Sequence, residues 1–225
     1  MNNYNSMAKF SLSVFLVLLL HSALHAQPFF PKDPVGEKPA DSWNFLPNQG
    51  QVFDLGGAYR GDVNFMSVST FPTLFMMKNN RIAVVIPELD TANAQNSVVH
   101  RIDVSFVGPQ ALAPTPALYQ PNTHRYNFFE QNTPQGVTGV QGGKTVLYEN
   151  MYDKIDLHIT SNKWGPKLYI VVRPGGDPND IELLCQGQDS LKVDVDGYLK
   201  LYFDTKFIKL TQGLAYQQEG EDSNC

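Results

Sequence analysis

The sequence predicts an all-β protein, an antiparallel β-sandwich of two sheets in one lobe or two, with little helix outside its N-terminal leader. Three observations predict this fold class. Short runs of β-branched and aromatic residues alternate with Gly, Pro and Asn turn signals from residue 43 onward. No dozen consecutive residues keep the i, i+3, i+4, i+7 spacing of apolar side chains that an amphipathic helix requires. Several runs alternate polar with apolar residues, which gives those strands one wet and one buried face.

The predicted strands are short and follow one another closely: residues 63–68, 73–78, 81–86, 98–107, 125–129, 144–148, 155–160, 167–173, 181–185, 191–195, 198–203 and 207–210. The run at 82–86 is apolar on both faces, which predicts a central position in a sheet. Residues 87–97 are polar and predict an exposed loop.

Alternation assigns faces in the run that begins at Leu191. There Leu191, Val193 and Val195 face one way and predict a buried face, opposite Lys192 and Asp194.

Three turns have a physical cause. Asn79 and Asn80 tolerate the positive φ angles of a tight two-residue hairpin, and Asp196 with Gly197 predicts a second hairpin of this kind. Residues 174–178, with two Pro and two Gly, force a further turn.

The first residues predict an export signal with cleavage after Ala26, which makes Gln27 the mature N-terminus. Lys9 supplies the positive end, and the apolar run 10–20 follows it. A membrane anchor is the competing interpretation, but this run is shorter than the roughly 20 residues that cross a bilayer. No later stretch is apolar enough to span. We expect a secreted or cell-surface protein divided into a signal peptide at 1–26, a linker at 27–42, a β-sandwich domain at 43–218 and a polar tail at 219–225.

The composition restricts the kinds of partner and of cross-link that the chain is expected to have. The net charge is −5 and the 17 Lys and Arg residues are scattered, so no basic stripe predicts a nucleic-acid partner. The two cysteines are too few for a disulfide framework. Cys185 shares a strand face with Ile181 and Leu183, which predicts a buried thiol, and a bridge to Cys225 is the alternative.

Two glycine-containing motifs imitate ligand loops. Three residues, where a phosphate-binding loop has four, separate Gly139 from the Gly143-Lys144 pair, so we predict a glycine loop that leads into a strand. Residues 192–197 place acids as a calcium loop does, but the twelfth position is Phe203 and not a bidentate carboxylate. A plain hairpin is the prediction there.

Other polar groups give no complete site. Asp156 and His158 share a strand face near Asp153, so a metal or acid–base pair is geometrically possible, but no third ligand is evident and His100 and His124 lie in unrelated segments. Arg60-Gly61-Asp62 matches a tripeptide read by adhesion receptors, and a turn is the simpler interpretation. Aromatic residues that could stack on sugars or fill a core are Tyr119, Tyr126, Phe128, Phe129, Tyr148 and Tyr152.

Several segments together resemble a known family. The opening Asn-x-Gly-Gln motif matches residues 48–51, and a central His with a Phe-x-Gly strand matches His100 and residues 104–108. Further matching blocks are 125–129, 148–157, 167–178, Ile181, Gly187, Leu191, Asp194, Gly197, Leu199, Leu201 and 215–217. Their order and spacing are similar to the uncharacterised N-terminal β-domain of large secreted proteins with SBBP repeats, polycystic-kidney-disease-type domains and a type IX secretion sorting domain. The resemblance covers most of residues 43–218.

The resemblance implies an extracellular or cell-surface protein linked to adhesion or gliding motility, with no catalytic residues to carry over. The chain departs from the pattern at Phe129-Glu130, where Gly-Asn is usual, and at Leu184-Cys185, where an aromatic is common. It carries neither repeats nor a sorting domain, so we expect either part of a longer protein or a stand-alone copy.

The sequence predicts no catalytic residue, no metal ligand and no cofactor, and the partner is an unknown protein or glycan. The leading hypothesis is a non-catalytic scaffold or interaction module. The alternatives are a carbohydrate-binding or adhesive module, and a hydrolase that uses Asp153 or Asp156.

Overall fold

The computed structural model describes residues 44–68, 71–92, 97–162, 165–204 and 206–210. The predicted signal peptide 1–26, Gln27, the linker 27–42, the tail 219–225 and Cys225 lie outside these residues.

The described chain is nearly all β, which confirms the predicted fold class. Its strands are β1 Asn44–Pro47, β2 Val63–Val68, β3 Thr73–Met77, β4 Arg81–Glu88, β5 Val98–Val107, β6 Ala117–Phe128, β7 Val137–Tyr152, β8 Ile155–Asn162, β9 Gly165–Val172, β10 Glu182–Gln186, β11 Ser190–Val193, β12 Leu199–Phe203 and β13 Lys206–Leu210, and a single turn of 3-10 helix, η2, covers Pro178–Asp180. Every pair of named strands is antiparallel. Within the described ranges, no helix reaches the length and apolar character needed to cross a bilayer.

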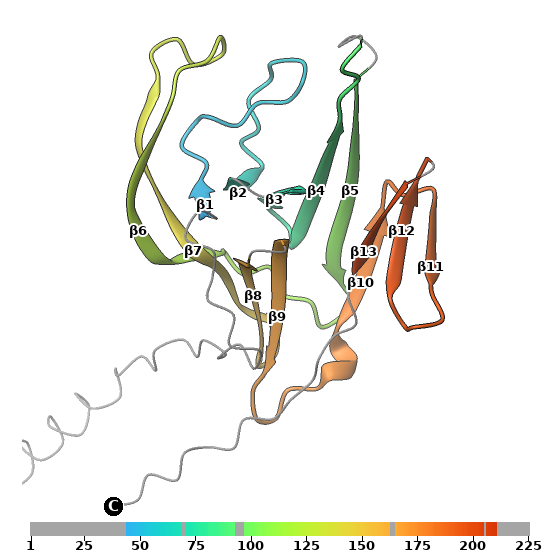
Figure 1. Cartoon of the computed structure of the whole chain (residues 1–225). Coiled ribbons are helices and arrows are strands. Elements are labelled where there is room, and N and C mark those ends of the chain that lie inside the picture. Colours follow the sequence, from blue (N-terminus) through green and yellow to red (C-terminus); the bar gives the residue numbers. More distant parts are fainter. Residues whose placement is uncertain (1–43, 69–70, 93–96, 163–164, 205, 211–225) are drawn as a thin grey trace, which may run out of the picture. The chain divides into compact units, whose positions relative to one another are not determined.

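The strands form two sheets (Figure 1). The larger has ten strands in the order β10-β5-β4-β3-β2-β1-β7-β8-β9, with β6 also paired to β7, and the smaller has the order β11-β12-β13. The 16-residue β7 joins the parts of the larger sheet. Gly143 lies opposite both Phe45 and Pro121, so β6 pairs with one side of β7 while β1 pairs with the other.

One hydrophobic core joins the two halves of the larger sheet. Buried residues of β4 and β5, such as Ile82 and Ile102, belong to the same cluster as Val146 of β7 and Leu157 of β8. The sheet therefore curls, and its halves face each other across the core as the layers of a sandwich do. Each large apolar side chain buried there contributes about 1.5–3 kcal/mol to folding.

The Tyr152 side chain links the two halves at the end of β7. Its hydroxyl oxygen lies 2.9 Å from the carbonyl oxygen of Val107 in β5 and 3.1 Å from that of Glu182 in β10, and it accepts a hydrogen bond from the Glu182 N–H at 3.2 Å. The single hydroxyl proton is best placed to donate to the nearer carbonyl, that of Val107. Burial raises the pKa of this phenol, so the hydroxyl keeps its proton.

The glycine segment does not form the loop that the sequence predicted, because it lies inside β7. A Cβ atom built on Gly143 would come within 2.6 Å of the Tyr119 carbonyl oxygen, and one on Gly142 within 2.8 Å of Leu46. Glycine is required there because β6 and β1 both approach the β7 backbone closely. The predicted strand 144–148 is therefore only a part of β7, the predicted strand 125–129 covers the last residues of β6 and runs one residue past its end, and β1 was not predicted.

The predicted burial of Leu191 and Val193 is wrong. These side chains do share a face, because Leu191 lies opposite Leu201 and Val193 opposite Leu199. Leu191 is nevertheless 47% exposed and Val193 66% exposed, since β11 is an edge strand beyond the part of the small sheet that packs on the core. Val195 is also exposed.

Local signals predicted other elements in part. Asn79 and Asn80 have the predicted positive φ angles, 61° and 56°, but the turn is not a two-residue hairpin, because Met77 pairs with Arg81 and residues 78–80 lie between them. The central position of β4 is confirmed, because it pairs with β3 and β5, and it extends to Glu88, so the exposed loop begins later than predicted. The hairpin at Gly197 is longer than two residues, because β11 ends at Val193 and β12 begins at Leu199.

Cys185 is partly and not fully buried, since it lies on the edge strand β10. Its side chain packs against the core, and its thiol is free. Burial raises the pKa of this thiol, which keeps it in the unreactive protonated form.

Replacing Tyr152 with Phe should destabilise the chain by about 1–2 kcal/mol, because the change leaves the Glu182 N–H and the Val107 carbonyl without this partner. Chemical denaturation of the wild type and the variant measures the loss. The matched control is Tyr148→Phe, since the Tyr148 hydroxyl is buried without a hydrogen-bond partner in the described structure. Equal effects of the two substitutions would contradict a specific role for the Tyr152 hydroxyl.

Candidate functional site

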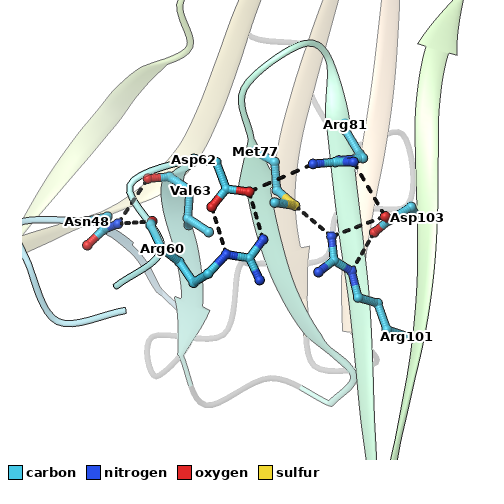
Figure 2. Close-up of polar contacts among 8 residues, drawn as sticks. All are labelled: Asn48, Arg60, Asp62, Val63, Met77, Arg81, Arg101 and Asp103. Atoms are coloured by element: carbon cyan, nitrogen blue, oxygen red, sulfur yellow. Dashed lines mark hydrogen bonds and ion pairs between the residues drawn. The ribbon is translucent and has the colours of Figure 1, made fainter. Parts of the chain in front are cut away.

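The Asn-x-Gly-Gln motif at residues 48–51 serves the fold. The Asn48 amide donates to the carbonyl oxygens of Arg60 at 2.9 Å and Val63 at 3.1 Å, as Figure 2 shows. Its own oxygen accepts from the Gly50 N–H at 3.1 Å, and the Gln51 amide donates to the Pro47 carbonyl at 2.7 Å. The motif thus ties the chain after β1 to the start of β2.

A chain of alternating charges crosses the sheet beside this motif (Figure 2). Arg60 donates to Asp62 at 2.8 and 2.7 Å, and Arg81 lies 3.8 Å from both Asp62 and Asp103. Arg101 completes the chain with a 2.8 Å contact to Asp103, and it also contacts the Met77 sulfur at 3.2 Å. The Arg60 guanidinium lowers the pKa of Asp62 through its hydrogen bonds. Two carboxylates are thus shared by three arginines, and the Arg81–Asp103 contact links the neighbouring strands β4 and β5.

This geometry bears on the Arg60-Gly61-Asp62 tripeptide. Residues 61–62 form a turn before β2, as predicted. A receptor that reads the tripeptide would first have to break two charge-assisted hydrogen bonds between Arg60 and Asp62. The Arg60 and Asp62 side chains are therefore already paired with each other in the folded chain.

Asp156 and His158 lie on one face of β8, as predicted, but their two side chains have different environments. The Asp156 carboxylate accepts from the Asn150 N–H at 2.7 Å and lies 3.2 Å from the Arg173 guanidinium. His158 is 2% exposed, and burial lowers its pKa. Asp153 lies in the exposed turn before β8.

The remaining candidate ligands are dispersed. His124 is exposed on β6, whereas His100 on β5 contacts Glu88 at 3.3 Å and the Phe203 ring at 4.6 Å between centroids. The described residues contain no group of three or more His, Cys, Asp or Glu side chains that could hold a metal ion.

The six aromatic residues selected from the sequence differ in burial: two are buried, three are partly buried and one is exposed. Tyr148 and Tyr152 belong to the core, and Phe129 is exposed at the end of the β6–β7 hairpin. The others, Tyr119, Tyr126 and Phe128, are partly buried along β6.

A face that the sequence did not suggest lies on the three-stranded sheet β11-β12-β13 (Figure 1). Lys192, Lys200 and Lys209 lie directly opposite one another on its three strands. Side chains alternate along a strand, so Tyr202 and Phe207 share this face. We call it the lysine–aromatic face: Lys192, Tyr198, Lys200, Tyr202, Phe207 and Lys209.

Each lysine of this face lies over an aromatic ring. The ammonium nitrogen is 5.5 Å from the ring centroid for Lys192 on Tyr202, 4.9 Å for Lys200 on Phe207 and 3.3 Å for Lys209 on Tyr198. Such contacts contribute about 0.5–1 kcal/mol each at exposed sites. They offset part of the repulsion between like charges placed directly opposite, which costs roughly 0.2–1 kcal/mol per pair.

A single carboxylate compensates this row. Asp194 lies 3.1 Å from Lys200, and no other ion pair of the described residues involves the three lysines. The Asp194 carboxylate also accepts hydrogen bonds from the Tyr198 and Asp196 N–H groups at 3.0 Å each. These bonds, the one from Tyr198 foremost, lower the pKa of Asp194. In the segment that resembled a calcium loop, the Asp194 carboxylate therefore closes a hairpin.

The opposite face of the small sheet attaches it to the core. Leu201 and Phe203 are buried there, and Ile208 packs beside them. An ion pair between Lys206 and Glu88 at 2.5 Å adds a polar link between β13 and β4. The lysine–aromatic face is consequently turned away from the core.

One sequence signal could have found this face. Tyr198, Lys200 and Tyr202 alternate with leucines, and Phe207 and Lys209 alternate with Ile208 and Leu210. This period of two predicts one aromatic and cationic face, but only the register aligns the lysines across strands.

The fold places the chain in the class of antiparallel, sandwich-like β-domains, here with an added three-stranded sheet. More particularly, a family model described as a domain of unknown function (DUF7948) matches residues 45–224, and the chain belongs to this family. No curated protein and no solved structure matches the chain.

Replacing Asp62 with Asn should cost about 0.5–1 kcal/mol near neutral pH, because the ion pair with Arg60 is partly exposed. Folding lowers the Asp62 pKa, so its contribution is complete above the unfolded-state pKa of about 4 and is lost as the pH falls through the folded-state pKa. Urea denaturation at neutral and at acidic pH should show the gap between variant and wild type closing on acidification. Asp153→Asn, in an exposed turn, is the control. A gap that persists in acid would contradict the ion pair.

Proposed function

We propose that this chain is a non-catalytic β-sandwich module of a secreted or cell-surface protein, and that it acts as an interaction domain through its three-stranded sheet. One observation carries the proposal: sheet β11-β12-β13 exposes large side chains on both faces. Leu191 and Val193 are exposed on the face that also carries the buried Leu201, and Phe207 is exposed on the other.

A sheet that only covers a core ordinarily has one apolar face against the core and one polar face in water. Here the apolar face extends past the core at Leu191, Val193 and Leu210. Contiguous apolar surface on a folded domain is typical of interaction sites. The edge strand β9 adds three half-exposed apolar side chains, those of Leu168, Ile170 and Val172.

The non-catalytic part of the proposal is supported by how the fold uses its polar groups. Asp62, Asp103 and Asp156 each pair with an arginine, and Asp194 closes a hairpin. The secreted part is supported by the apolar leader that ends at Ala26.

The proposal predicts that the chain leaves the cell and binds cell surfaces. The whole chain, expressed with its leader, should be recovered outside the cytoplasm with the mass of a product that begins at Gln27. When this product is labelled, its binding to intact producing cells should be saturable and should be displaced by unlabelled product. A product that stays inside with its leader attached would contradict the secreted location.

A variant altered on both faces of the small sheet tests the site of binding: Val193→Glu, Lys192→Glu and Lys209→Glu together. Its surface binding should fall at least about tenfold, because apolar and charged contacts are removed from the interface. The matched control changes one exposed apolar residue and two exposed cations elsewhere: Leu55→Glu, Lys78→Glu and Arg125→Glu. Equal losses in both variants would contradict a role for the small sheet.

A further inference from the structure

We propose that the lysine–aromatic face binds a linear acidic polysaccharide, one that carries a carboxylate on its sugar residues. The inference rests on the proposed interaction function and names the class of its ligand.

Charge is the first argument. Lys192, Lys200 and Lys209 stand in one row across three strands, and Asp194 pairs with only one of them. Like charges directly opposite each other destabilise a sheet, so this row departs from what folding alone favours. Departures of this kind concentrate at functional sites. The uncompensated cations favour an anionic ligand, although the chain as a whole carries a net charge of −5.

The aromatic rings decide between kinds of anion. Tyr198, Tyr202 and Phe207 lie under the lysine ammonium groups on the same face, and the Phe207 ring stays 47% exposed. A simple anion needs the ammonium groups alone, whereas a pyranose ring also has an apolar face that can pack on an aromatic ring. Cations interleaved with rings therefore suit a polymer that alternates charge with sugar rings.

The shape of the site suits a linear, polymeric ligand. A sheet face is an open platform and not a pocket, and its neighbouring strands lie about 4.8 Å apart. The lysine row thus repeats positive charge at short, regular steps across β11, β12 and β13. A linear polysaccharide presents its acidic groups in a similar repeating manner.

Two other polyanions fit less well. Nucleic-acid binding commonly uses about 6–10 phosphate contacts, and this face supplies three lysines. An anionic membrane would be met by a surface with apolar side chains that insert, but here Phe207 is the one exposed large apolar residue of the face. The experiment therefore also measures binding to a nucleic acid and to an anionic membrane.

The experiment measures binding of the secreted product to immobilised polygalacturonate by biolayer interferometry. Dextran is a neutral sugar polymer, polyglutamate is a carboxylated polymer without sugar rings, and single-stranded DNA and phosphatidylserine vesicles represent the other polyanions. We expect binding to polygalacturonate at least about tenfold tighter than to each of the others, because only this probe satisfies both the lysines and the rings. Equal or tighter binding to polyglutamate, DNA or vesicles would overturn the proposal.

Variants locate the binding on this face. Lys192→Gln with Lys209→Gln, and separately Phe207→Ala, should each weaken polygalacturonate binding at least about fivefold, since they remove the charge and the stacking surface respectively. Lys209→Arg keeps the charge and should bind as the wild type does. The charge-matched control is Lys78→Gln with Arg125→Gln, which should change nothing. Near-ultraviolet circular dichroism confirms that each variant is folded.

Failure of this inference is distinguishable from failure of the proposed function. Binding to cells that survives periodate oxidation of surface glycans, together with no binding to polygalacturonate, overturns the ligand class and leaves the interaction role in place. Absence of any saturable cell binding overturns the interaction role itself.

Discussion

One hydrophobic core, shared by both halves of the larger sheet, holds the curled sheet closed, and the hydrogen bonds of one hydroxyl group fix where the halves meet. Tyr152 ends β7, and its hydroxyl meets the backbone of β5 at Val107 and of β10 at Glu182, so strands that are distant in sheet order become neighbours. Both halves of the sheet can then bury their apolar faces against each other. Because β10 leads directly into β11, the same junction fixes where the three-stranded sheet begins.

Much of the fold follows from local patterns, and the exceptions have non-local causes. The turn at Asn79 and Asn80 and the central β4 depend on residue type and apolar runs, which a sequence displays. The extent of β7 does not, because Gly142 and Gly143 are required by the close approach of β6 and β1. Alternation in β11 shows which side chains share a face, but whether that face is covered depends on the position of the core.

Local sequence patterns and non-local strand pairing also differ in what they indicate about function. The polar residues that the sequence makes conspicuous, Asn48, Asp62 and Asp156, are engaged by neighbouring backbone or arginine groups. Their chemistry serves folding. The lysine row of the small sheet forms no motif along the chain and arises only when the register aligns three strands. The sequence of such a domain predicts its strands, whereas the lysine–aromatic face, for which we propose a binding role, forms only when the three strands pair.

Hydrogen–deuterium exchange of the wild-type chain tests the closure most directly. β10 is an edge strand with exposed leucines, so without closure its amides would exchange through local opening. If the core closes the sheet and Tyr152 fixes β10 at the junction, the β10 amides bonded to β5 should exchange as slowly as those of β4, through global unfolding alone. Rapid exchange in β10 while β4 and β5 stay protected would contradict the account.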